Sequence, residues 1–138
     1  MVSLIIMNNK IWLKEIKNNF NQAASDYKDY CLIQKYFAKK IGNFIKDLKI
    51  PNGELFDFGS GTGLLADEIE IVLKRNLCRV DFCNNMLEMN KKSRKKLLWD
   101  LNNDLPSYIE NCALIASNFC IHWLNEPEKI LKNWFHKL

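Results

Sequence analysis

Hydrophobic and polar positions follow one another in blocks whose spacing predicts three amphipathic helices. Residues 29–48 place apolar side chains on one helical stripe, made of Ile33, Phe37, Ile41, Phe44, Ile45 and Leu48. Residues 64–75 do the same with Leu65, Ile69, Val72 and Leu73. Residues 125–128 read Asn-Glu-Pro-Glu, a helix-start pattern with Asn125 as the cap. The apolar face of this last helix consists of Ile130, Leu131, Trp134, Phe135 and Leu138.

Short apolar blocks between these helices predict strands at residues 54–58, 77–82 and 97–101. Residues 112–117 are apolar almost throughout, which is typical of a strand buried on both faces of a parallel sheet. A further helix is expected from Met86 to about Lys95, capped by Asn84 or Asn85. Strands that alternate with helices predict an α/β fold with a parallel sheet.

Composition predicts one folded domain. The chain has 138 residues, of which 48% are hydrophobic and 26% charged. No apolar run reaches the ~18–20 residues of a membrane helix, and no secretory leader is recognisable, so we expect a cytoplasmic protein with no membrane partner. The net charge is +4, and the densest basic run is residues 91–96. No aromatic residues interleave that run, so we interpret it as the solvated end of a helix, against the alternative of a nucleic-acid patch.

The five cysteines lie scattered along the chain without a C-x-x-C pair: Cys31, Cys78, Cys83, Cys112 and Cys120. Neither His122 nor His136 lies near a cysteine pair. We therefore expect structural free thiols and no metal site.

Residues 57–63 carry the most informative motif, Asp-Phe-Gly-Ser-Gly-Thr-Gly, where a predicted strand turns into a predicted helix. Glycine allows positive φ there and lets a ligand lie directly on the main chain. The spacing differs from the G-x-G-x-x-G fingerprint of dinucleotide sites. Asp57, two residues before the first glycine, would repel a phosphate. The loop therefore favours a cationic ligand.

Two more acids, Asp81 and Asp100, lie at the ends of predicted strands. Ligands of doubly wound sheets bind at the carboxyl ends of strands. There Asp81 can accept hydrogen bonds from both hydroxyls of a ribose, although it could also be an ordinary surface acid. Asp100 can accept a hydrogen bond from an amine such as adenine N6, or it could cap a helix. Phe82 can lie against an adenine, or it could simply pack in the core. Together the two acids and the glycine loop indicate a site for a neutral or cationic adenosine ligand.

The run Asp57-x-Gly-x-Gly-x-Gly63, followed by Val80-Asp-Phe-Cys-Asn-Asn-Met-Leu87, resembles motif I and the post-I region of class I S-adenosylmethionine-dependent methyltransferases. Further segments are similar to the malonyl-acyl-carrier-protein O-methyltransferases of biotin synthesis: residues 20–24 with Tyr27 and Gln34, residues 100–106, and residues 117–123. The resemblance implies S-adenosyl-L-methionine as cofactor. It also implies a methyl acceptor that is either acyl-carrier protein or a small molecule.

Carried onto this sequence, the resemblance implies a cofactor site made of Tyr27, Asp57, Gly59, Ser60, Gly61, Asp81, Phe82, Met86, Asp100, Leu101 and Asn118. Residues 59–61 would line the methionine part, Asn118 would lie near it, and Tyr27 would close over the pocket. A sulfonium methyl group is already electrophilic and a malonyl carboxylate is already ionised, so positioning and exclusion of water would carry catalysis. No catalytic base is expected, and His122 is interpreted as a rim or packing residue.

The family's sheet has seven strands in the order 3-2-1-4-5-7-6, and the predicted strands account for the first four. We therefore expect residues 1–50 to form a helical lid and residues 51–138 the front half of a Rossmann-like domain, with an open edge. A homodimer or a complementing C-terminal half would complete it. Two other functions stay open: a non-catalytic module that binds cofactor or pairs through its open edge, and a nicotinamide-dependent oxidoreductase, which the glycine spacing disfavours.

Overall fold

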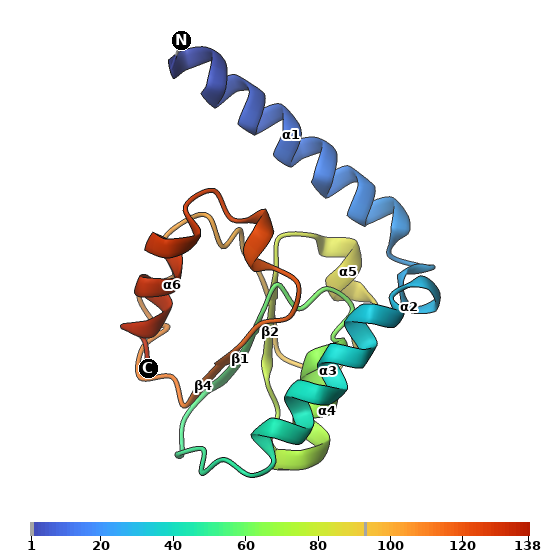
Figure 1. Ribbon diagram of the computed structural model, residues 1–138, viewed down its shortest axis with the longest axis vertical. Coiled ribbons are helices and arrows are strands. Elements are labelled where there is room, and N and C mark those ends of the chain that lie inside the picture. The colour runs from blue at the N-terminus through green and yellow to red at the C-terminus, as the bar shows by residue number, and fades with distance from the viewer. Residues whose placement is uncertain (1, 93) are drawn as a thin grey trace.

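A computed structural model describes residues 2–92 and 94–138, apart from the side chains of residues 2–10, 13 and 28. In chain order the elements are α1 (Val2–Ala23), α2 (Tyr27–Tyr30), α3 (Leu32–Ile45), β1 (Leu55–Phe58), α4 (Leu64–Leu73), β2 (Cys78–Asp81), α5 (Asn84–Glu88), β3 (Lys96–Leu98), β4 (Leu114–Ala116), the 3-10 helix η1 (Ile121–Trp123) and α6 (Pro127–Phe135). Three helices thus precede a sheet whose first strands alternate with helices (Figure 1).

The sheet is parallel throughout, and its strands lie in the order β3-β2-β1-β4. β1 lies between β2 and β4, with Asp57 opposite both Arg79 and Ala116. Every residue of β1 and β2 is buried, as expected for strands covered on both faces. The predicted α/β fold with a parallel sheet is confirmed.

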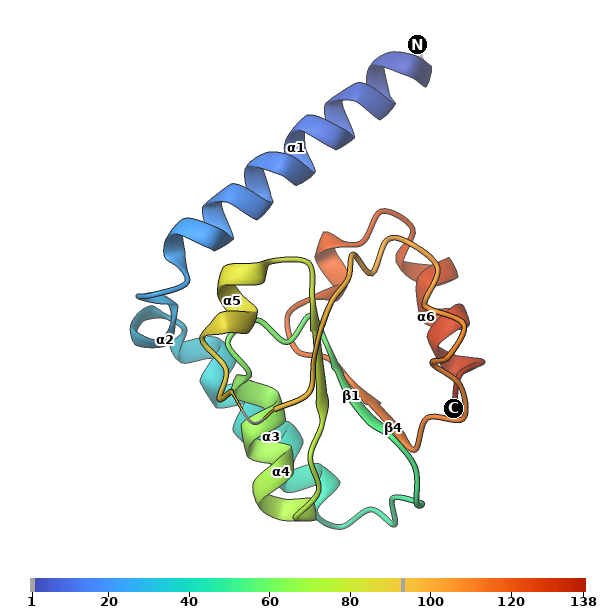
Figure 2. The ribbon, with the colours of Figure 1, turned by 180° about the vertical axis from the view of Figure 1, so that it is seen from behind.

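Helices cover both faces of this sheet. α3 and α4 pack together on one face, and α6 lies on the other (Figures 1 and 2). Trp134 of α6 packs against Phe58 of β1, with ring centroids 4.9 Å apart. Ala38 of α3 and Ile69 of α4 belong to the core on the opposite face. The five cysteine thiols are free and buried, as expected.

α1 extends away from the sheet as one long helix (Figures 1 and 2). Near its C-terminal end, the side-chain oxygen of Asn21 accepts hydrogen bonds from the Cys83 thiol at 2.8 Å and the Asn85 N–H at 3.3 Å. The Asn85 side chain donates back to the Asn21 carbonyl oxygen at 3.1 Å. These bonds tie α1 to the start of α5. Among the described helices, none is both long enough and apolar enough for a bilayer crossing.

Arg79 forms a buried ionic link between β2 and α4. Its guanidinium donates to Glu70 and to Asp67, both at 2.7 Å. Glu70 also accepts the N–H of Leu77 at 2.9 Å, just before β2. Paired charges with further hydrogen bonds are the form in which charged groups are tolerated in a protein interior. The link fixes α4 over β2 and so positions the loop that precedes α4.

α5 is shorter than predicted, because it ends at Glu88 rather than near Lys95. The Asn90 side chain donates to the carbonyl oxygens of Met86 at 3.2 Å and Gly61 at 3.0 Å. A side chain that bonds nearby carbonyls competes with the continuing helix. The interruption therefore connects the end of α5 to the glycine loop.

β3 ends at Leu98 rather than at residue 101, and α6 begins later than predicted. The chain turns after β3 because the Asp100 carboxylate accepts the N–H of Asn102 at 2.9 Å. Asn102 in turn accepts the N–H of Asn125 at 2.7 Å. Asn125 thus belongs to a contact between loops, and Glu126, which makes no side-chain capping bond, stands at the helix start.

The basic run at residues 91–96 is not the end of a helix, which corrects the prediction. Arg94 pairs with Glu70 at 2.8 Å, Lys95 pairs with Glu54 at 2.5 Å, and Lys96 begins β3. Within the described part of this run, ion pairs tie the segment to α4 and to the start of β1.

α3 buries only part of the apolar stripe that its sequence predicts. Ile45 of the stripe is buried with Ala38 and Gly42, whereas Phe44 of the stripe is 68% exposed. A Cβ added to Gly42 would lie 3.2 Å from the Cβ of Glu68 on α4. The two helices therefore approach most closely where α3 has its smallest side chains.

β4 and α6 are also less buried than predicted. Leu114 and Ile115 of β4 are only half-buried, because β4 has a strand neighbour on one side alone among the described residues. In α6, Trp134 is buried as expected, but Leu131 and Phe135 of the predicted apolar face are exposed.

Candidate functional site

Glycines hold the loop between β1 and α4 in left-handed conformations. Gly59, Gly61 and Gly63 have φ angles of 71°, 52° and 85°, which L side chains rarely adopt. Gly59 has no room for a side chain, because an added Cβ would overlap Cys120. The same atom on Gly61 would meet nothing within 4 Å. At Gly61 the main chain therefore faces open space.

Asp81 anchors this loop from the end of β2. Its Oδ2 accepts the N–H of Gly61 at 2.8 Å, and its Oδ1 accepts the N–H of Cys83 at 2.9 Å. Burial raises the pKa of Asp81, and these N–H donors partly oppose that rise. Each carboxylate oxygen has a second acceptor site. The side chain can therefore accept two hydroxyl donors from a ligand while it keeps the loop in place.

Asp57 lies buried beneath the loop with one oxygen unused. Its Oδ2 accepts the N–H of Ala66 at 3.1 Å, and its Oδ1 has no hydrogen-bond partner. Burial raises the pKa of Asp57 to about 7. The hydroxyl groups of Ser60 and Thr62 are also buried without partners. Because unpaired buried oxygens are uncommon, three of them in one short segment indicate a place for the donor groups of a ligand.

One cleft at the carboxyl ends of the strands brings together all the residues assigned to the cofactor site from sequence: Tyr27, Asp57, Gly59, Ser60, Gly61, Asp81, Phe82, Met86, Asp100, Leu101 and Asn118. The described residues that line it include three aspartates and no Lys or Arg. Such a lining favours a positively charged ligand over a phosphate. The free space is about 100 Å³, less than the ~300–1,000 Å³ of most ligand pockets.

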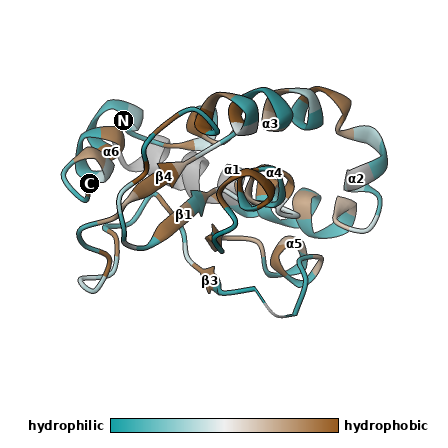
Figure 3. Cartoon of the chain, turned by 90° about the horizontal axis from the view of Figure 1, so that it is seen from below, coloured by the Kyte–Doolittle hydropathy of each residue, from teal (hydrophilic) through white to brown (hydrophobic). Residues whose placement is uncertain are grey.

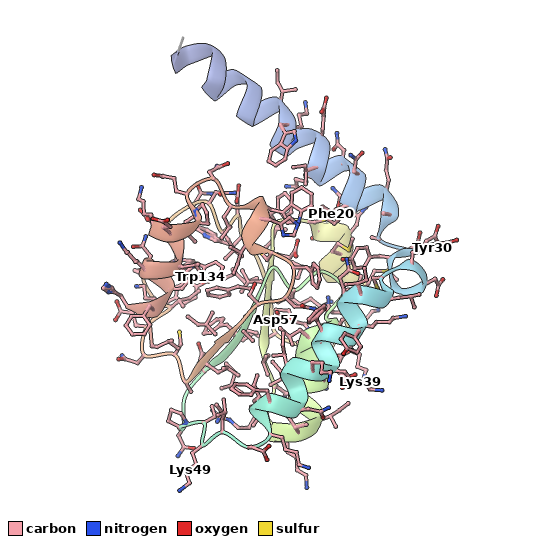
Figure 4. All side chains as sticks on the ribbon, viewed as in Figure 1. Phe20, Tyr30, Lys39, Lys49, Asp57 and Trp134 are labelled. Atoms are coloured by element: carbon pink, nitrogen blue, oxygen red, sulfur yellow. The ribbon has the colours of Figure 1, made fainter. Side chains whose placement is uncertain are left out.

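Aromatic side chains from distant parts of the chain fill the mouth of the cleft. The ring of Phe20 lies 6.3 Å from that of Tyr27, 6.5 Å from that of Phe82 and 5.6 Å from that of Trp123, between centroids. Figure 4 places Phe20 at the lower end of α1, above the strand ends. Burial raises the pKa of Tyr27. A ligand of nucleoside size would need this cluster to shift.

Asp100 lines the cleft and stabilises a turn rather than capping a helix, because no described helix begins between β3 and β4. Its Oδ1 accepts both the N–H and the side-chain amide of Asn102, at 2.9 and 3.0 Å. Beside it, Leu101 and Met86 are buried and present apolar surface to the cleft. This end of the cleft thus combines apolar walls with one carboxylate.

The segment after β4 closes the opposite side of the cleft. Ser117 Oγ donates to the Phe58 carbonyl at 2.7 Å, and Asn118 Nδ2 donates to the Gln34 carbonyl of α3 at 3.0 Å. Phe119 follows with a φ of 56°. A bulky residue in this region is strained and is held there by its surroundings.

Several residues at the cleft were not assigned to the site from sequence, among them Ile16, Phe20, Gln34, Thr62, Trp99, Cys120 and Trp123. Phe20, Gln34, Cys120 and Trp123 fall in segments that carry the family resemblance. Trp99 has no local signal, because only the tertiary fold brings it to the cleft. His122 lies outside the lining and packs against Trp123 at 4.6 Å, in keeping with a packing residue.

Comparison with known families gives a match over residues 56–138 to the methyltransferase domain. The chain is 29% identical over 120 residues to malonyl-[acyl-carrier protein] O-methyltransferase 2 of Ilyobacter polytropus, a match that covers 83% of this chain and 46% of that protein. It is 25% identical over 129 residues to the malonyl-[acyl-carrier protein] O-methyltransferase of Bacillus anthracis, covering 89% of this chain and 48% of that protein. The chain thus spans about half the length of these curated relatives.

Solved structures share the fold. A SAM-dependent methyltransferase of Thermotoga maritima superposes with a TM-score of 0.62 at 22% identity, covering 86% of this chain and 55% of that one. The plantazolicin methyltransferase BpumL, solved with SAH, gives a TM-score of 0.63 at 18% identity, covering 96% and 58%. The Rossmann-like arrangement expected from the sequence is therefore confirmed.

Proposed function

Because the chain belongs to the methyltransferase domain family, we propose that its cleft binds S-adenosyl-L-methionine for transfer of the methyl group to an acceptor. The observation that carries the proposal is the cleft lining, in which three aspartates surround a glycine loop and, among the described residues, no Lys or Arg takes part. A ligand with sulfonium and ammonium charges suits this lining. The pyrophosphate of a nicotinamide cofactor does not.

In this proposal the cofactor lies along the strand ends. Asp81 accepts the ribose hydroxyl groups, and Phe82 and Met86 pack against the adenine. Asp100 and Leu101 meet its amine edge. Each of these residues lines the cleft and comes from the ends of β2 and β3 or from α5.

The methionine part then lies over the open main chain of residues 59–61. The unpaired Oδ1 of Asp57 is a candidate acceptor for its ammonium group. Asn118 lies at the end near the reacting methyl group, and Tyr27 closes the cleft from α2.

The proposed acceptor is the malonyl carboxylate on acyl-carrier protein, supported by the names of the two curated relatives. The bound cofactor supplies an electrophilic methyl group. The protein's own task is to align an acceptor that is already ionised and to keep water out, which needs no general base. The aromatic cluster of Phe20, Tyr27 and Trp123 is suited to excluding water.

Calorimetric titration with S-adenosylhomocysteine tests the cofactor site. We expect saturable binding by the wild type and binding about 10–100-fold weaker in Asp81→Ala, because hydrogen bonds to a charged group contribute about 1.5–3 kcal/mol. Asp104→Ala is the matched control, since Asp104 is an exposed acid outside the cleft lining. Equal binding by both variants, or binding of NADH in place of S-adenosylhomocysteine, would contradict the proposal.

A second candidate function is a non-catalytic module that binds the cofactor or interacts with another protein. The exposed apolar faces of α3 and α6 favour it, because they leave part of the fold uncovered. A methyl-transfer assay on malonyl-acyl-carrier protein separates the two candidates. Cofactor binding without transfer of the methyl group would support the non-catalytic module.

A further inference from the structure

Asn90 is a buried polar residue that the proposed cofactor site does not include. It follows α5, is 6% exposed and does not line the cleft. A side-chain amide has two N–H donors. In Asn90 the Nδ2 atom donates to the carbonyl oxygen of Gly61 at 3.0 Å and to that of Met86 at 3.2 Å. The side chain therefore holds two separate segments of main chain together.

Gly61 depends on side chains for its place in the glycine loop. Main-chain bonds hold the start of the loop, where the N–H of Gly59 donates to the Val80 carbonyl oxygen at 2.8 Å. The N–H of Gly61 instead donates to Asp81 Oδ2 at 2.8 Å, and its carbonyl oxygen accepts from Asn90. A Cβ added to Gly61 would meet nothing within 4 Å. Packing does not confine it on that side, so the Asp81 and Asn90 side chains set its orientation.

Asn90 is itself firmly held against the loop. Its N–H donates to the Leu87 carbonyl oxygen at 3.1 Å, and its carbonyl oxygen accepts from Lys96 Nζ at 3.2 Å. A Cβ added to Gly63 would overlap Asn90 Oδ1, so the two residues are in close contact. α5 lies on the same side of the sheet as α4 and away from α6 (Figures 1 and 3). Asn90 thus joins the end of α5 to the loop that precedes α4.

The two carbonyl groups that Asn90 joins belong to opposite ends of the proposed cofactor site. Gly61 presents open main chain where the methionine part is proposed to lie, and Met86 lines the cleft where the adenine is proposed to lie. A ligand that spans both ends binds more tightly when their spacing is already correct, because less ordering is then needed on binding. A ligand that occupies only the adenine end does not depend on that spacing.

We propose that Asn90 is a positioning residue, which holds the glycine loop at a fixed distance from α5 so that both parts of the cofactor fit the cleft together. It acts through Gly61 and Met86 and does not touch the ligand. This inference rests on the proposed function and deepens it, because it assigns to Asn90 the preference of the cleft for the whole cofactor over its nucleoside part.

Two ligands test the proposal by calorimetric titration. S-adenosylhomocysteine spans both ends of the cleft, whereas 5′-methylthioadenosine has the same thioether nucleoside and no amino-acid part. We expect Asn90→Ala to bind S-adenosylhomocysteine about tenfold more weakly than the wild type, and to bind 5′-methylthioadenosine as the wild type does. Asn84→Ala is the matched control, because Asn84 is exposed on α5 and does not line the cleft. It should leave both affinities unchanged.

Thr62 provides a spectroscopic measurement that needs no ligand. It is the only threonine of the chain, so isotope labelling of threonine nitrogen gives one amide signal by NMR. Its N–H belongs to the same peptide group as the Gly61 carbonyl, and hydrogen bonds at the two ends of one peptide group polarise each other. We expect Asn90→Ala to lower the proton chemical shift of this signal and Asn84→Ala to leave it in place.

Asn90→Asp provides a second variant, should Asn90→Ala fail to fold. It keeps the size of the side chain but replaces the amide by a carboxylate, which when ionised only accepts hydrogen bonds. At alkaline pH it should therefore show the same selective loss of S-adenosylhomocysteine binding and the same change of the Thr62 signal.

Equal weakening of both ligands in Asn90→Ala would overturn the proposal, because it would show a general loosening of the fold. Unchanged S-adenosylhomocysteine binding would also overturn it, as would an unmoved Thr62 signal or an equal loss of binding in Asn84→Ala. Failure of the wild type to bind S-adenosylhomocysteine would count against the proposed function. The Thr62 signal would then still decide whether Asn90 holds the Gly61 carbonyl.

Discussion

At the scale of single residues, Asp57 is a carboxyl group in surroundings that disfavour its charge. It is 1% exposed, its Oδ1 has no partner, and burial raises its pKa to about 7. An unfolded chain gives an aspartate a pKa of about 3.9. Between these values the folded protein binds a proton that the unfolded chain releases.

We expect Asp57→Asn to flatten the pH dependence of stability. In the wild type, the free energy of unfolding should fall as the pH rises from about 4 to about 7 and then level off. A shift of about three pKa units corresponds to about 4 kcal/mol. Urea unfolding across this range measures the effect. Asp81, whose pKa burial also raises, should leave a residual slope in the variant.

Equal slopes in the wild type and in Asp57→Asn would show that Asp57 titrates normally. Asparagine suits this comparison because its side-chain oxygen can still accept the N–H of Ala66, which Asp57 Oδ2 accepts at 3.1 Å. The variant therefore removes the titration and keeps the hydrogen bond.

At the scale of elements, two glycines of the loop between β1 and α4 have different surroundings, one inside the protein and one at the cleft. Gly59 faces Cys120 inside the protein, and Gly61 faces open space at the cleft. Both have positive φ. Gly59 therefore has to be glycine for the protein to pack, whereas Gly61 leaves room for a ligand.

We expect Gly59→Ala and Gly61→Ala to fail in different ways. Gly59→Ala should prevent stable folding, because its Cβ overlaps Cys120 and its φ is strained. Gly61→Ala should cost about 1–3 kcal/mol of stability from backbone strain alone, yet lose S-adenosylhomocysteine binding, since its Cβ projects into open space. Thermal unfolding and calorimetric titration measure the two effects. Wild-type binding by Gly61→Ala would place the ligand away from this loop.

The periodicity of α3 and α6 predicted helices correctly, but the buried part of each helix is narrower than the predicted apolar face. Both carry apolar side chains on a wider face than the described fold covers, so Ile33 and Phe135 are exposed. Periodicity shows which side of a helix is apolar, but not which neighbouring element covers that side. α5 was predicted too long because no local pattern shows that Asn90 bonds to the glycine loop.

More of the cleft lining than of the helix packing could be predicted from the sequence. Asp57, Asp81 and Asn118 meet at one cleft because the ends of parallel strands share one edge of the sheet. The aromatic residues at the mouth, Phe20 and Trp123, are over one hundred positions apart. Only the path of the folded chain brings them together.

At the scale of the whole molecule, the first and last thirds of the chain meet over the cleft. Trp12 of α1 lies 5.9 Å from Trp123 of η1, and Phe20 lies 5.6 Å from the same ring, between centroids. The free space of about 100 Å³ beneath them is small for a nucleoside. Ligand entry therefore requires this contact to rearrange.

We expect S-adenosylhomocysteine to change the tryptophan fluorescence of the wild type as the aromatic cluster shifts. Trp123→Phe should reduce this fluorescence change, because it removes the indole that reports the shift. The phenylalanine keeps an aromatic ring at the cleft. Trp134→Phe is the control, since Trp134 packs on Phe58 on the other face of the sheet. An unchanged signal in Trp123→Phe would show that the cluster stays in place on binding.

The five buried free thiols can be used to detect local opening of the fold. Cys31 precedes α3, Cys78 lies in β2, Cys83 precedes α5, and Cys112 and Cys120 flank β4. A thiol reagent reaches each only when its surroundings open, so five alkylation rates sample five regions without engineered labels. Cysteines beside an uncovered edge should react before those in the centre of the sheet, and the order of modification maps where unfolding begins.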